Sequence, residues 1–477
     1  MTNKYIKKPK IETPERISKY EKFNLRENPF PSNPFLAQHS SDKRVNGSIY
    51  ETSIRSEEYT QLVENFLSKP QHDLSRNKLG FLMDTSYVGR GNGKTAFLMH
   101  LLKKDINNDY CNEISKEENK CFGVRVQPEN GGKTKTFDKL IEKTIEEIFS
   151  STILKECIIS IYLTAIANRY PDKIEDILKK LEENEEDKYY NILTDSNWLN
   201  DNEINLSELM NTINENKFIK ELSSEFYNYI IGSKQGRLFY INQLLSAEKI
   251  KEYYYQILNK NDKTSFFFND LIYFFEAANF NGAYIFIDDF ERIPDFQSER
   301  DRRDFANNLR TYFFDGSSEN AKKGFYNLLL VLHAGVPRLI EKAWGDSGME
   351  QRCSLTTSDK KNPEPHQIIF KPLDKNYSNK LVKAYLDEFR ISKDKKNETF
   401  PFEQSALDKI HSFSQGNVSS ILKNCHFILE QALSDNLDNI DQKFIYDYFQ
   451  KTTINTGTED DNLLNEAKVN LTEDLND

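Results

Sequence analysis

A glycine-rich segment between an apolar strand and an apolar helix constrains the fold of this 477-residue chain more than any other feature. The run LGFLMDT (79–85) predicts a buried strand, and TAFLMHLLKK (95–104) predicts a helix. Between them lies VGRGNGKT (88–95), in which three glycines alternate with polar residues. This order of strand, loop and helix predicts an α/β fold in which the loop lies at the carboxyl edge of a parallel sheet.

The residue types in this loop suit an anion with several phosphates. Its glycines allow backbone N–H groups to turn inward without a Cβ clash. The helix that begins near Lys94 directs its N-terminal dipole at the anion, Lys94 can reach the β- and γ-phosphates, and Thr95 can ligate Mg²⁺. ATP and Mg²⁺ are therefore the expected cofactors. The predicted nucleotide-binding residues of this segment are Gly89, Arg90, Gly91, Asn92, Gly93, Lys94, Thr95 and Ala96.

The loop departs from the strict phosphate-binding pattern, and the chain contains a second Gly-Lys-Thr. The pattern G-x-x-x-x-G-K-[ST] requires glycine where the chain has Val88, and the glycine comes one residue later. NGGKTK (130–135) follows another predicted strand, CFGVRVQP (121–128), but no glycine stands five residues before Gly132. We therefore expect the first loop, and not the second, to bind phosphate.

An acidic segment follows a further predicted strand. YIFIDDFER (284–292) places two aspartates directly after four apolar residues. This is typical of a buried parallel strand with carboxylates at its C-terminal edge, where α/β sheets bind ligands. We expect Asp288 to hold the Mg²⁺ shell and Asp289 to polarise the attacking water. Glu291, two residues further on, is the alternative base.

With these two segments in the places of Walker A and Walker B motifs, the chain resembles the AAA+ class of P-loop ATPases. Within that class it is similar to origin-initiator-like proteins, transposition-helper ATPases and BREX-type phage-defence ATPases. LLLVLHAGVPRLI (328–340) is similar to the sensor-1 strand, with His333 near the position of the polar sensor residue that contacts the nucleotide. MEQRCSL (349–355) is similar to the box that carries the arginine finger, so Arg352 is the candidate for that role. Arg292 and Arg338 are alternatives.

The resemblance continues into a C-terminal helical lid, with one departure. FSQGNVSSILKNCHFILEQAL (413–433) is similar to the lid helix that contains the sensor-2 arginine. This chain has Ser419 at that position, and Lys423 one turn later is the candidate substitute. The departure puts fast hydrolysis in doubt.

The remaining pattern predicts the domain organisation. A stretch of charge-rich helical pieces, such as KIEDILKKLEENEEDKYY (173–190), contains no convincing strand and predicts a helical insertion. The expected fold is a P-loop NTPase parallel sheet flanked by helices, with this large helical insertion and an all-helical lid. In chain order we expect an extended N-terminal arm (1–50), the first part of the ATPase core (51–153), the insertion (154–265), the second part of the core (266–373), the lid (374–450) and an acidic disordered tail (451–477).

Charge and cysteine content exclude several other classes of function. The chain has 64 Lys and Arg against 75 Asp and Glu, so its net charge is −11, which is unusual for a protein that coats nucleic acid. Its five cysteines and seven histidines show no metal-ligand spacing. The sequence has no run of 18 apolar residues and no apolar leader at its start. We therefore expect a cytoplasmic protein that does not contact membranes.

The expected function is Mg²⁺-dependent ATP hydrolysis by an oligomeric motor or loader in a DNA-linked or phage-defence complex. The resemblance implies a homo-oligomer in which Arg352 completes the ATP site of the neighbouring subunit. The insertion is the expected surface for a protein partner, because ATPase chemistry does not need it, and DNA is an open alternative. A slow nucleotide-dependent switch or scaffold with little turnover is the alternative function, which Ser419 favours.

Overall fold

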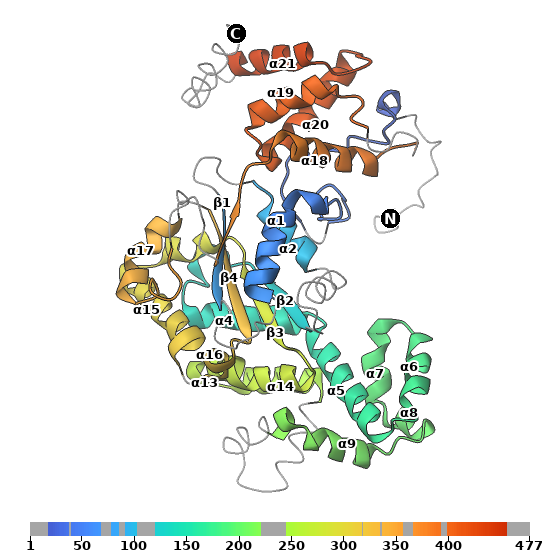
Figure 1. The fold of residues 1–477 in the computed structure, drawn as a ribbon, viewed down its shortest axis with the longest axis vertical. Coiled ribbons are helices and arrows are strands. Elements are labelled where there is room, and N and C mark those ends of the chain that lie inside the picture. The colour runs from blue at the N-terminus through green and yellow to red at the C-terminus, as the bar shows by residue number, and fades with distance from the viewer. Residues whose placement is uncertain are drawn as a thin grey trace, which may run out of the picture. The chain divides into compact units, whose positions relative to one another are not determined.

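The computed structural model divides the chain into two compact units (Figure 1). The sheet unit contains Arg55–Arg90 and Lys94–Lys371, and the helical unit contains Met1–Ile54, Gly91–Gly93 and Pro372–Asp477. Three residues of the glycine loop therefore belong to a different unit from the strand before them and the helix after them. The residues that the structure describes are 18–37, 40–67, 78–84, 91–102, 120–220, 245–316, 318–333, 336–355, 366–392 and 398–455.

The sheet unit is built on a parallel sheet of five strands in the order β2-β3-β4-β1-β5. Every residue of β1, β3 and β4 is buried, as expected for a parallel sheet with both faces covered. This confirms the predicted α/β fold with a parallel sheet. The strands are β1 (Leu79–Asp84), β2 (Cys121–Val126), β3 (Gly282–Ile287), β4 (Tyr326–Leu332) and β5 (Gln367–Phe370).

The chain reverses its direction across the sheet at β1. From β1 it crosses to β2 at one edge and returns through β3 to β4, and from β4 it passes β1 to reach β5 at the other edge. Right-handed crossovers then put the helices after β1 and β4 on opposite faces. Figure 1 shows α2 (Lys94–Leu101) on one side of the sheet and α17 (Val336–Asp346) on the other. The carboxyl ends of β1 and β4 thus form a topological switch point, where open α/β sheets bind ligands.

Amphipathic helices cover the sheet because their apolar residues recur every three or four positions. In α4, Leu140, Ile141, Thr144, Ile145 and Ile148 are buried, while the residues between them face solvent. The other helices that pack around the sheet are α1 (Ser56–Leu62), α5 (Ile153–Arg169), α13 (Lys260–Ser265), α14 (Leu271–Ala277), α15 (Glu299–Arg310) and α16 (Glu319–Lys323), and α4 itself is Phe137–Ser150.

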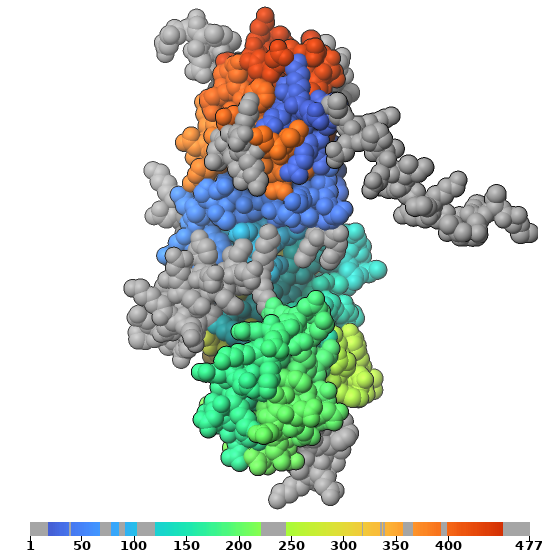
Figure 2. All heavy atoms as spheres, turned by 90° about the vertical axis from the view of Figure 1, so that its right-hand side faces the viewer, coloured from blue at the N-terminus to red at the C-terminus, as the bar shows by residue number. Residues whose placement is uncertain are grey.

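The described residues of the predicted insertion form helices joined by turns and loops, and Figure 2 shows them, in green, as a lobe on the surface. Its core is continuous with that of the sheet, because α5 belongs to the same apolar cluster as α4 and α14. Among the described helices, none is by itself long and apolar enough to cross a membrane; α4 and α5 pass that test only as a pair, which is bent by 60°. The helices after α5 are α6 (Ile174–Glu182), α7 (Tyr189–Thr194), α8 (Ser196–Asp201), α9 (Leu206–Glu215) and α12 (Ala247–Gln256).

The helical unit differs from the expected organisation at its N-terminal end. Phe23, Leu25 and Phe30 are buried in one apolar cluster with the C-terminal helices. Figure 2 shows this segment, in dark blue, among the orange and red helices. The expected extended arm (1–50) therefore contributes to a packed core. The expected acidic tail (451–477) begins inside the last helix, which ends at Asn455, and its remainder lies outside the described residues. The C-terminal helices are α18 (Lys375–Glu388), α19 (Gln404–Ser414), α20 (Val418–Ser434) and α21 (Gln442–Asn455).

Candidate functional site

The second half of the glycine loop has a backbone that requires glycine. Gly91 has φ +109° and Gly93 has φ +87°, conformations that residues with a Cβ rarely adopt. A Cβ on Gly91 would also lie 2.7 Å from the Cβ of Ser419. The predicted residues Gly89 and Arg90, together with Val88, lie outside the described residues.

The loop contacts the first turn of α20 within the helical unit. The N–H of Ser419 donates to the carbonyl oxygen of Gly91 at 3.0 Å, and Nδ2 of Asn417 lies 3.4 Å from Oδ1 of Asn92. Oδ1 of Asn417 accepts the N–H of Ser420 and so caps the helix. The loop and this cap thus satisfy two of the four N–H groups that the start of a helix leaves without partners. Ser419, which stands where the resemblance predicted a sensor-2 arginine, contacts the loop through its backbone N–H.

Lys94 and Asp84 form an ion pair at the switch point. Lys94 is the first residue of α2, and its Nζ contacts Oδ2 of Asp84, the last residue of β1. The side chain of Asp84 is fully buried and that of Lys94 is 13% exposed, so the two charges leave water together. The sequence analysis did not single out Asp84. The available signal was an acidic residue at the end of an otherwise apolar strand, four residues before the start of the loop.

The predicted metal ligands Thr95 and Asp288 are neighbours although 193 residues separate them. Oγ1 of Thr95 lies 3.5 Å from Oδ1 of Asp288, and Ala96 follows in the first turn of α2. One hydroxyl and one carboxylate oxygen suit Mg²⁺, which takes hard oxygen ligands and usually keeps water or phosphate in most positions. No cluster of three or more His, Cys, Asp or Glu that could form a larger metal site occurs among the residues described.

Asp288 also pairs with Arg125, another residue that the sequence analysis missed. Nε of Arg125 donates to Oδ2 of Asp288 at 2.9 Å, and Nη2 lies 2.8 Å from the same oxygen. Asp288 is 2% exposed, so the guanidinium compensates a carboxylate that has left water. The signal in the sequence was a lone arginine inside the apolar strand β2.

Asp289 is held by two donors from its own chain. Its φ of +51° places it in the left-handed region, and its Oδ2 accepts from Nη2 of Arg292 at 2.7 Å and from Nε2 of Gln127 at 3.2 Å. Arg292, an alternative arginine finger, also donates to Asn130 at 3.0 Å. The second Gly-Lys-Thr segment begins at this Asn130, and its Lys133 is 75% exposed.

Glu291 and His333 meet at the same edge of the sheet. Oε1 of Glu291 lies 3.8 Å from Nε2 of His333, which follows the last residue of β4. Glu291 is 4% exposed and His333 has a third of its side chain in solvent. The structure therefore brings the alternative base next to the predicted sensor residue.

The described contacts of Arg352 are to residues of the sheet unit other than the predicted phosphate and metal ligands. Its Nε and Nη2 lie 2.9 and 2.8 Å from Oδ1 of Asp315, and its Nη1 donates to the carbonyl of Gly348. Hydrogen bonds from Arg310 and then Arg352 hold the pKa of Asp315 below its ordinary value. Among the described contacts of Arg352, none is to Lys94, Thr95 or Asp288. The side chain of Arg338 lies outside the described residues.

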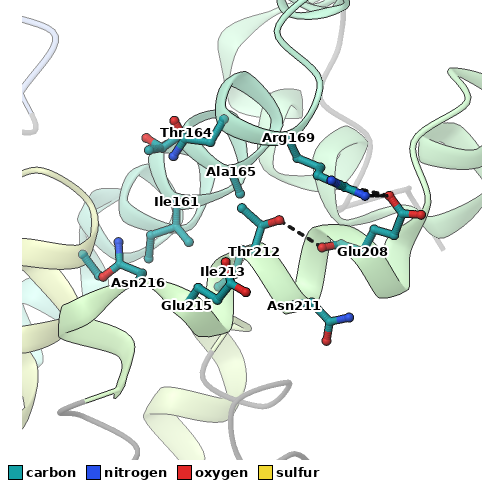
Figure 3. Close-up of a pocket in the computed structure, with 12 residues that line it drawn as sticks. Ile161, Thr164, Ala165, Arg169, Glu208, Asn211, Thr212, Ile213, Glu215 and Asn216 are labelled. Atoms are coloured by element: carbon teal, nitrogen blue, oxygen red, sulfur yellow. Dashed lines mark hydrogen bonds and ion pairs between the residues drawn. The ribbon is translucent and has the colours of Figure 1, made fainter.

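A separate hollow of about 610 Å³ lies between α5 and α9 in the insertion (Figure 3). Its lining combines amide, hydroxyl, charged and aliphatic side chains, and two of the lining residues, Arg169 and Glu208, form an ion pair of 2.8 Å. The polar residues that line it are Thr164, Asn168, Arg169, Glu208, Asn211, Thr212, Glu215 and Asn216.

Comparison of the chain with protein-family models, curated proteins and solved structures finds no match.

Proposed function

We propose that the chain binds and hydrolyses ATP with Mg²⁺ at the carboxyl edge of its parallel sheet. One observation carries this proposal: Thr95, directly after Lys94 at the start of α2, lies 3.5 Å from Asp288 at the end of β3. A nucleotide with its metal uses a lysine, a helix N-terminus, a hydroxyl and a carboxylate together. The switch point and the two glycines of positive φ support the same ligand.

Each residue then has a distinct role. Backbone N–H groups from the glycine loop to Thr95 bind phosphate oxygens, and Lys94 exchanges the carboxylate of Asp84 for the β- and γ-phosphates. Thr95 and Asp288 hold Mg²⁺, which neutralises charge on the phosphate oxygens when it is bound.

The geometry favours Glu291 over Asp289 as the group that orients the attacking water. Two donors, Arg292 and Gln127, already hold the carboxylate of Asp289. Glu291 is 4% exposed, and its Oε1 lies 3.8 Å from Nε2 of His333, which follows the last residue of β4. A base must be able to take a proton, and the two donors that hold the carboxylate of Asp289 oppose this.

We infer an AAA+-type motor or loader that oligomerises through the ATP site, with Arg352 acting on the neighbouring subunit after it releases Asp315. The insertion is the proposed surface for a protein partner, and the hollow between α5 and α9 supports this. DNA stays the alternative partner. The cytoplasm is the proposed compartment, where the free thiols of Cys121, Cys157, Cys353 and Cys425 would persist.

The second candidate function is a slow nucleotide switch, and the contact between Ser419 and Gly91 favours it. Serine at this position brings no cation to the γ-phosphate, as an arginine there would, yet the helix that carries it is hydrogen-bonded to the glycine loop. ATP would then order the lid without rapid turnover.

Isothermal titration of ATP into the chain, with and without Mg²⁺, tests the proposed binding. Steady-state hydrolysis with and without DNA then separates the two functions. A motor predicts turnover that DNA or a partner stimulates, and a switch predicts tight binding with slow turnover. Absence of Mg²⁺-dependent ATP binding by the folded protein would overturn both.

A further inference from the structure

One arginine controls how the carboxylate of Asp288 is presented. Arg125 lies on β2 opposite Phe286 of β3, so its long side chain reaches the diagonal neighbour two residues on, which is Asp288. Nε of Arg125 donates to Oδ2 of Asp288 at 2.9 Å, and Nη2 lies 2.8 Å from the same oxygen. The described contacts of the guanidinium therefore all fall on one of the two carboxylate oxygens.

The other oxygen of Asp288 is less fully engaged. Oδ1 accepts the N–H of Asp289 at 3.1 Å, and the hydroxyl of Thr95 lies 3.5 Å away, at the outer limit of a hydrogen bond. The side chain of Asp288 is 3% exposed, so surrounding atoms prevent it from turning to present both oxygens. The carboxylate thus offers Oδ1 alone, on the side of Thr95.

A carboxylate with a single open oxygen distinguishes two common divalent cations. Ca²⁺ takes about six to eight oxygens in flexible shells and often uses both oxygens of one carboxylate, whereas Mg²⁺ has a small octahedral shell and needs one oxygen from each. We propose that Arg125, by occupying Oδ2, makes the site selective for Mg²⁺ over Ca²⁺. This inference rests on the proposed function, because it assigns Asp288 to the metal of a bound nucleotide. Arg125 acts through Asp288 and is a positioning residue.

Isothermal titration of ATP into the full chain, in MgCl₂ and in CaCl₂, gives the ratio of the two dissociation constants. Arg125→Leu removes both donors, whereas Arg125→Gln keeps one N–H donor near the position of Nε. We expect the preference for Mg²⁺ to fall by about tenfold in Arg125→Leu and by less in Arg125→Gln, because Oδ2 becomes open to Ca²⁺. If the substitution acted only by removing a positive charge, both cations would bind more tightly and the ratio of the two dissociation constants would not change.

Arg292→Leu is the matched control. Arg292 donates to the neighbouring Asp289 at 2.7 Å, and we expect its removal to leave the ratio at the value of the unmodified chain. Thermal unfolding shows which variants fold, and Arg125→Gln decides the question if Arg125→Leu does not fold.

The outcomes separate this inference from the proposed function. Folded Arg125 variants that bind ATP with an unchanged ratio would overturn the selectivity role and leave the proposed function standing. An equal change of the ratio in Arg292→Leu would also overturn it, since the effect would then not depend on the contact between Arg125 and Asp288. An unmodified chain that binds ATP with neither cation would overturn the proposed function and this inference together.

Discussion

The backbone N–H of Ser419 donates a 3.0 Å hydrogen bond to the carbonyl oxygen of Gly91, and this bond joins the glycine loop to the first turn of α20. A bound phosphate would draw the N–H groups of the loop towards itself, and the carbonyls between them would turn with the same peptide planes. The start of α20 is therefore sensitive to what the loop binds. This coupling needs no arginine on the lid.

The first prediction concerns the cap of α20. Asn417→Ala removes the side chain that caps the helix and approaches Asn92, so we expect a loss of about 1 kcal/mol in the free energy of unfolding. We also expect weaker ATP binding, because the loop loses a neighbour. Denaturant unfolding and isothermal titration measure the two effects. Asn205→Ala is the matched control, since Asn205 caps α9 in the insertion. Equal ATP affinity in the two variants would contradict the coupling.

The second prediction separates binding from stability at the switch point. Lys94→Ala should weaken ATP binding by roughly 2–3 kcal/mol, the upper range for hydrogen bonds to charged groups. It should also lower the free energy of unfolding, because a buried carboxylate loses one of its partners. Adding Asp84→Asn should restore stability and leave ATP binding weak.

Lys133→Ala, in the exposed second Gly-Lys-Thr, should change neither quantity. Loss of binding in Lys133→Ala, with Lys94→Ala unaffected, would place the phosphate site in the other loop.

The third prediction distinguishes the two candidate bases. Glu291→Gln should bind ATP with normal affinity and lose most of its hydrolysis, whereas Asp289→Asn should retain a substantial rate, because Asp289 is already held by Arg292 and Gln127. Single-turnover hydrolysis and ATP titration on each variant measure these effects. The reverse pattern would return the base role to Asp289.

The fourth prediction tests Arg352 between subunits. Arg352→Ala should bind ATP and lose hydrolysis by about 10³-fold, as arginine fingers do. Asp315→Asn should raise or maintain the rate, because it frees Arg352 from its partner within the chain. Mixing Arg352→Ala with Glu291→Gln subunits should restore some activity, since some interfaces then combine an intact Arg352 with an intact Glu291. No regained activity in a mixture that co-assembles would limit Arg352 to a role within its own chain.

The fifth prediction concerns acid stability of the helical unit. Burial raises the pKa of Glu430, but hydrogen bonds from Lys19, Tyr20 and Asn28 outweigh this and lower it to about 2 from 4.5. A lowered pKa stabilises the fold above pH 4.5, and this stabilisation is lost as the pH falls towards 2. Because Glu430 is partly exposed, we expect a contribution on the order of 1 kcal/mol. Urea unfolding measures the free energy of unfolding at pH 7 and at pH 3. The difference between these two values should be smaller in Glu430→Gln than in the unmodified chain. An unchanged difference would mean that these bonds do not persist in solution.

Apolar runs in the sequence predicted the strands β1, β2, β3 and β4, because a parallel sheet covered on both faces requires continuous apolar strands. The meeting of Thr95 and Asp288 also followed from the sequence, since both stand where loops gather at the carboxyl edge. The partners Asp84 and Arg125 could not be predicted, because their contacts depend on strand order and register. The packing of Phe23 and Phe30 was missed as well, since these residues lie in a Pro-rich stretch without helical or strand periodicity.

The assignment of Gly91–Gly93 to the helical unit has a consequence for any attempt to dissect the molecule. The link at Lys371–Pro372 looks like a natural place to cut the gene into two separately expressed halves. A fragment that ends there would keep Lys94, Thr95 and Asp288 but would lack the α20 groups that hydrogen-bond to the glycine loop. Its failure to bind a ligand would then report an incomplete loop and not a missing contact to that ligand. The two units are each compact, but they cannot be expressed separately without breaking the hydrogen bonds of the glycine loop.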